Sequence, residues 1–135
     1  MSPKKLSTRS ADLAWARGRR RVAEKYHEVA DLIAEEDGAS INVCVGLCVL
    51  AGIAAGDAIC AAATGERYSG RDHAGAAGLL SRIDSSAGKH LRDLVALKPP
   101  AHYGENLLRS RERDAALRAA AALISEARKR TSTGR

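Results

Sequence analysis

The sequence has few of the large side chains that usually fill a protein core. Phenylalanine is absent from its 135 residues, there is one tryptophan and one methionine, and aromatic residues make up 3% of the chain. Alanine and glycine are abundant instead, so the core must be packed from small side chains that allow helices to approach closely. A chain of this length forms one domain, and this composition favours an all-α fold.

Cysteine is too scarce for a disulfide framework or a zinc site. Cys44, Cys48 and Cys60 are odd in number and lie inside an apolar segment, where a thiol behaves as a small hydrophobic group. Cys44 and Cys48 have the spacing of one helix face, but no further Cys or His pair completes a metal site. The N-terminus lacks the apolar segment of a signal peptide. We therefore expect a reduced, cytoplasmic protein with no metal and no cofactor.

The positive charge is concentrated at the two ends of the chain. The formal net charge is +6, and residues 1–10 and 128–135 hold seven cations and no acid. The other 15 basic and 16 acidic side chains leave a net charge of −1. We expect residues 1–9 and 131–135 to be solvated, disordered basic tails. Arms that hold an acidic partner, including DNA, are the alternative.

Residues 41–60, INVCVGLCVLAGIAAGDAIC, carry no charge before Asp57. A membrane span of this length needs strongly apolar side chains, whereas this segment is mostly Ala, Gly, Cys and Val and includes a carboxylate that is costly in lipid. A helix that is apolar on every side suits the centre of a helical bundle. Gly46, Gly52 and Gly56 would let a neighbouring helix approach closely, either from the same chain or from a second copy. No membrane association is expected.

Helical periodicity surrounds this apolar segment. Residues 10–37 place Val22, Tyr26 and Val29 on one helix face. The apolar helix follows over residues 40–65, and the last helix covers residues 110–129.

Between them, a third helix begins near Ser69 and Asp72, which have the spacing of a capping box. It restarts at Asp84 or Ser86 and ends before Pro99 and Pro100, after which we expect a loop. No alternation typical of strands is present. The pattern predicts an up-down four-helix bundle over residues 10–130, with a broken third helix.

Three groups of polar residues stand out against this background. Arg71, Asp72 and His73 open the third helix, where a capping box and a solvated histidine are the alternative to a site. Lys98, His102 and Tyr103 surround the two prolines, where a histidine packed on the rim of the core is the alternative.

The third group is Asp57 alone on its apolar helix. Burying this carboxylate without a partner would cost several kcal/mol, so it is expected to pair with Arg67, Arg71, His73 or His102. A purely structural ion pair is the alternative to a functional one.

The common catalytic signatures are missing. The sequence has no glycine-rich phosphate loop, no nucleophile elbow, no HExxH and no pair of carboxylates at catalytic spacing. Four arginines near the start of the first helix (Arg17, Arg19, Arg20 and Arg21) form a weak nucleic-acid signal, because acidic residues follow them.

Together these residues resemble the HEPN superfamily, small four- or five-helix bundles of bacterial defence and toxin systems. The resemblance covers residues 20–127 and is closest to an actinobacterial-type subgroup. It is carried by NVCVGLCVLAGIAAGDAIC, by GRDHAGAAGLL and by LRDLVALKPPAHYG, which looks like the position of the family's Arg-x4–6-His motif.

The resemblance implies a homodimer whose two motifs face each other and, in active members, RNA cleavage without a metal ion. It places His102 as the motif histidine, acting as general base or acid, with Tyr103 orienting it or holding phosphate. Lys98, four residues before His102, takes the place of the motif arginine, and Arg92 is too distant. Asp57, Arg71, Asp72 and His73 would support them.

Three functions remain open from the sequence. The first is a HEPN-like ribonuclease, such as the toxin of a toxin–antitoxin pair, with a cognate antitoxin or nucleotidyltransferase-like partner. The second is a non-catalytic dimer that binds a protein, a nucleotide or nucleic acid. The third is a DNA-associated protein that uses its basic tails.

Overall fold

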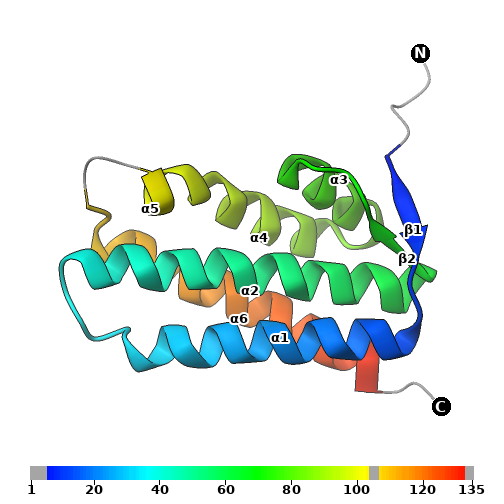
Figure 1. Cartoon of the computed structure of the whole chain (residues 1–135), viewed down its shortest axis with the longest axis horizontal. Coiled ribbons are helices and arrows are strands. Elements are labelled where there is room, and N and C mark those ends of the chain that lie inside the picture. The colour runs from blue at the N-terminus through cyan, green and yellow to red at the C-terminus, as the bar shows by residue number, and fades with distance from the viewer. Residues whose placement is uncertain (1–5, 104–106, 133–135) are drawn as a thin grey trace.

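The computed structural model describes residues 6–103 and 107–132, except for the side chain of Tyr103. The chain is mostly helical, as expected for an all-α fold, and its elements follow one another along a bundle (Figure 1). They are β1 (Thr8–Ser10), α1 (Leu13–Leu32), α2 (Ala39–Thr64), β2 (Glu66–Tyr68), α3 (His73–Ile83), α4 (Ser85–Ala96), α5 (Lys98–Tyr103) and α6 (Ser110–Ser132).

The apolar helix α2 forms the centre of the bundle. It packs against α1, α3, α4, α5 and α6, and its largest fully buried side chain is Ile59. By length and composition α2 could cross a membrane, but 72% of its most apolar window is buried within the fold. The prediction that this segment forms a core is confirmed.

Glycine allows two of these contacts. A methyl group at Gly52 would collide with Leu94 of α4, and one at Gly56 would lie 3.1 Å from Leu91 Cδ2. Both leucines are almost fully buried. The close approach expected at these glycines is therefore made by α4 of the same chain.

The predicted break in the third helix lies at Asp84, which separates α3 from α4. Its backbone N–H donates to Leu80 at the end of α3, and its carboxylate accepts a hydrogen bond from the Ala87 N–H at 3.0 Å. One aspartate thus closes one helix and caps the next.

The described parts of both predicted tails are structured, whereas residues 1–5 and 133–135 lie outside the described residues. Thr8 and Arg9 lie in β1, which pairs with β2 in a two-stranded antiparallel ribbon. Thr131 is fully buried, and its carbonyl accepts a hydrogen bond from Arg17 Nε at 3.0 Å. The sequence did not predict the ribbon because strands of three residues are too short to show an alternating pattern.

The loop predicted over residues 101–108 begins later than expected, because residues 98–103 form α5; residues 107–108 are irregular as predicted, and residues 104–106 lie outside the described residues. Proline lacks an N–H, but the first turn of a helix needs none, so Pro99 and Pro100 end α4 and begin α5. Helix α1 ends at Leu32, five residues before the expected Asp37.

Candidate functional site

Helix α5 carries all three predicted catalytic residues, and the side chains of two of them, Lys98 and His102, are described. Lys98 and His102 are four residues apart, so they lie on neighbouring turns of the same helix face. Lys98 Nζ lies 2.8 Å from His73 Nε2 at the start of α3. The structure therefore joins a residue of the first predicted group to a residue of the second.

The charge state of His73 follows from this contact. Burial lowers the pKa of His73, the charge of Lys98 lowers it further, and Asp72 opposes them. A neutral imidazole can accept a hydrogen bond from the lysine ammonium at Nε2, which leaves the ring proton on Nδ1. His73 then orients Lys98 without neutralising its positive charge.

Asp72 supports the start of α3 in an unexpected way. It occupies the cap position, but its side chain makes no capping hydrogen bond to the helix. Instead it accepts a hydrogen bond from the Tyr68 hydroxyl, an interaction that raises the pKa of Tyr68. Gly70 and Gly75 leave room for the Tyr68 ring. The predicted capping box does not form, because α3 begins at His73 and Asp72, rather than Ser69, occupies the cap position.

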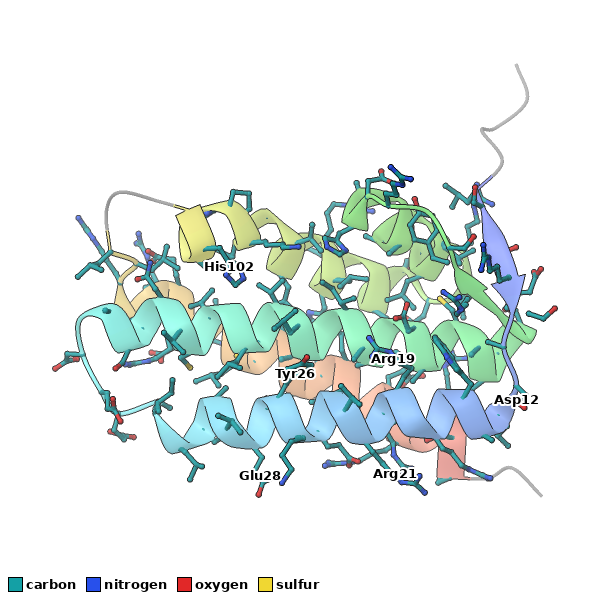
Figure 2. The ribbon with its side chains drawn as sticks, in the orientation of Figure 1. Asp12, Arg19, Arg21, Tyr26, Glu28 and His102 are labelled. Carbon is teal, nitrogen blue, oxygen red and sulfur yellow. The ribbon has the colours of Figure 1, made fainter. Side chains whose placement is uncertain are left out.

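His102 points from α5 toward α2 (Figure 2). Its ring lies over Gly46, where an added methyl group would be 3.2 Å from Cε1. Beside the ring is a groove with a cavity volume of about 250 Å³. Its lining residues are Asn42, Val43, Gly46, Leu47, Leu50, Ala101 and His102. The groove is therefore mostly apolar, with an imidazole and an amide at its edge.

Asn42, on α2, makes two hydrogen bonds beside the groove. Its Oδ1 accepts a hydrogen bond from the Leu108 N–H at 2.9 Å, and its Nδ2 donates to the Pro100 carbonyl at 3.5 Å. The amide thus links α2 to α5 and to the segment that leads into α6.

Asp57 does not belong to this group. Its carboxylate pairs with Arg19 of α1 at 3.3 Å, and not with any of the four partners expected from the sequence. Burial raises the pKa of Asp57, while Arg19 and then Arg67 oppose the rise. Asp57 is eleven residues beyond Gly46, or about 16 Å along α2, so it lies far from His102.

Two predicted site residues, Arg71 and Tyr103, remain to be placed. Arg71 is exposed, and the side chain of Tyr103 lies outside the described residues. Sequence reasoning did not identify Asn42 as a site residue, and it treated Gly46 only as a packing position. The sequence offered one signal for Asn42, which is that it is a polar residue near the start of an apolar helix.

The described residues contain no group of three or more His, Cys, Asp or Glu side chains that could hold a metal ion. The three cysteines are buried, and burial raises the pKa of Cys60 to about 12. Comparisons of the chain with family models and with curated proteins find no match.

Proposed function

We propose that this protein is a HEPN-like helical domain that cleaves RNA without a metal ion, with His102 and Lys98 as its catalytic residues. The observation that carries the proposal is the arrangement of these side chains on one face of α5, with Lys98 Nζ 2.8 Å from His73 Nε2. An exposed imidazole about one helical turn from an oriented ammonium group offers the proton transfer and the charge stabilisation that phosphodiester cleavage by the 2′-hydroxyl uses.

The chemistry divides between the two residues. His102 takes the proton of a ribose 2′-hydroxyl as its oxygen attacks the adjacent phosphorus, and the bond to the 5′-oxygen of the next nucleotide breaks. That oxygen receives a proton from water or from the protonated His102. Lys98 stabilises the negative charge that develops on the non-bridging oxygens. The products are a 2′,3′-cyclic phosphate and a 5′-hydroxyl.

Lysine in place of arginine limits this activity. An ammonium group acts as a point charge and lacks the two-pronged fork with which arginine binds a phosphate. His73 compensates in part, because its neutral Nε2 fixes the direction of the Lys98 side chain. We expect slow turnover, as suits a protein held in check by an antitoxin or a nucleotidyltransferase-like partner in the cytoplasm.

A homodimer is the second part of the proposal. Val43 is 56% exposed, and Val22 and Val29 of α1 are each 39% exposed. Apolar residues at such positions are the kind that a second copy would cover. In this arrangement the two α5 helices would lie near one another and line a shared cleft, within a four-helix bundle fold of the HEPN type.

A non-catalytic binding module is the second candidate. The observation in its favour is the groove beside His102, which is mostly apolar and tied together by Asn42. In that case His102 would contact a ligand or a partner protein without turnover, and binding would raise the melting temperature.

The test is cleavage of single-stranded RNA in the presence of EDTA by the wild type and by His102→Gln. We expect the substitution to lower the rate at least about 100-fold, the size of a lost general acid or base. His90→Gln, on α4, is the matched control and should retain the wild-type rate. Cleavage by His102→Gln at the wild-type rate would contradict the proposal, and the absence of cleavage by the wild type would favour the binding module.

A further inference from the structure

The ribbon places two arginines directly opposite each other. In the register of β1 and β2, Arg9 is the partner of Arg67. Opposed residues of an antiparallel pair project from the same face, where like charges repel. The Arg67 guanidinium lies 5.4 Å from the centre of the Trp15 ring, so this face is the one beside the start of α1.

The nearby carboxylates have other hydrogen-bond or ion-pair partners. Asp12 accepts a hydrogen bond from the Trp15 N–H at 2.8 Å, and Glu66 accepts one from the Thr8 hydroxyl at 3.0 Å. Asp57 is 3.3 Å from Arg19 and is also influenced by Arg67.

Asp57 therefore lies near two guanidinium groups, those of Arg19 and Arg67. Within residues 6–103 and 107–132, no ion pair joins Arg9 or Arg67 to an acid. The ribbon thus presents two guanidinium groups, outside any such ion pair, beside an indole ring.

Asp57, which Arg67 influences, shares a face of α2 with two residues of the groove beside His102. Val43, Leu50 and Asp57 are seven residues apart in turn, which is close to two full turns of α2. The ribbon lies at the end of the bundle where α2 ends, and α5 lies beside its beginning (Figure 1). Half-buried Leu47, Leu50 and Ile53 occupy the interval. The full length of α2 is about 39 Å.

We propose that Arg9, Arg67 and Trp15 form a second contact site for single-stranded RNA, at a distance from the cleavage site. The two guanidinium groups bind backbone phosphates, and a base contacts the exposed part of the half-buried indole ring. Bases between the two sites lie on the apolar face of α2. The choice of RNA as ligand rests on the proposed function.

Trp15 provides the test, because it is the only tryptophan in the chain. A 12-nucleotide 2′-O-methyl RNA, which cannot be cleaved through its 2′-oxygen, is titrated into the full-length protein while Trp15 emission and the anisotropy of a label on the RNA are recorded. We expect both signals to change with the same midpoint. The double variant Arg9→Gln/Arg67→Gln should bind about tenfold more weakly, with a salt slope smaller by about 1.4.

The matched control is Arg21→Gln/Arg118→Gln, which removes the same charge from exposed positions of α1 and α6. Arg21 points away from α2 (Figure 2). This control should bind within twofold of the wild type. Arg9→Gln alone, on the edge of the ribbon, should give an intermediate affinity, which guards against misfolding of the double variant.

Cleavage of a dinucleotide separates this inference from the proposed function. A dinucleotide is too short to reach from His102 to the ribbon, so the ribbon variant should cleave it at the wild-type rate while losing activity on long RNA through a higher KM. If no protein cleaves either substrate but the ribbon variant still binds more weakly than the control, the contact site is supported and the proposed catalysis fails. Equal binding by the ribbon variant and the control, an unchanged Trp15 signal, or no binding by the wild type would overturn the contact site.

Discussion

The cations at the two ends of α2 have different partners. Arg19 lies 3.3 Å from a carboxylate, Asp57, so its charge is largely balanced within the fold. Lys98 lies 2.8 Å from an imidazole that burial keeps neutral, so its charge is oriented but not cancelled. The difference indicates that the α5 end is suited to an anionic ligand, whereas the Arg19–Asp57 pair links α1 to α2 within the fold.

Gly52 and Gly46, both on α2, make room for different kinds of side chain. Leu94 fills the space beside Gly52, whereas the ring of His102 fills the space beside Gly46. The same residue type thus allows core packing at one position and places a polar, exposed side chain at the other. Substitutions at the two glycines should therefore affect different properties of the protein.

The largest effect on stability is expected at Gly52. Gly52→Ala would place a methyl group against the buried Leu94 side chain, and we expect a loss of about 2 kcal/mol in the free energy of unfolding. Gly18→Ala on α1 meets nothing within 4 Å and should instead raise stability by about 0.5 kcal/mol through helix propensity. Urea denaturation compares them, and equal effects would contradict the packing described for Gly52.

The protonation of His73 should appear as a pH dependence of both stability and activity. Its folded pKa is lowered, so the unfolded chain binds more protons below the ordinary value of 6.5. The stabilising contribution is therefore complete above pH 6.5 and is lost as the pH falls through the folded pKa. His73→Gln should flatten this part of the stability curve and reduce cleavage at neutral pH. Stability curves of the two proteins that fall in parallel on acidification would show that His73 does not titrate as described.

Gly46→Ala should change activity rather than stability. The added methyl group would lie 3.2 Å from His102 Cε1, so the ring must move by a few tenths of an ångström. We expect RNA cleavage to fall about threefold to tenfold, because small displacements of a catalytic group slow the reaction. The thermal unfolding midpoint should be unchanged or slightly higher. A variant with normal cleavage would remove Gly46 from the positioning of His102.

The smallest effect is expected from Asp57→Asn. Burial raises the pKa of Asp57 despite Arg19, so ionisation costs more in the folded state than in the unfolded chain. A neutral residue of the same shape should therefore match or exceed the wild type at pH 7, by less than about 1 kcal/mol. The advantage should shrink as the pH falls toward 4. A clear loss of stability at pH 7 would mean that the ion pair with Arg19 outweighs the cost of burial.

The helical core could be predicted well because its signal is local. Residues 41–60 are apolar on every side, and only the centre of a bundle or a membrane suits such a helix. Asp84 could be predicted as a helix boundary because aspartate is a strong cap. Helix α5 could not be predicted in this way, since two prolines indicate the end of one helix as well as the start of another.

The site depends on pairs that are distant in the sequence. His73 and Lys98 are separated by 25 positions, and each was identified, but nothing in either segment indicates the other. The partner of Asp57 was wrong because the sequence offered several cations, and the orientation of α1 against α2 selects Arg19. The ribbon and its opposed arginines depend on a pairing across 58 positions.

The proposed function requires that the α5 end of the bundle cleave RNA through the 2′-hydroxyl. The most direct measurement is the mass of the fragments that the wild-type protein releases from a defined RNA in EDTA. Fragments ending in a 2′,3′-cyclic phosphate, with matching 5′-hydroxyl ends, are the predicted result. Intact RNA, or fragments with 3′-hydroxyl and 5′-phosphate ends, would contradict it.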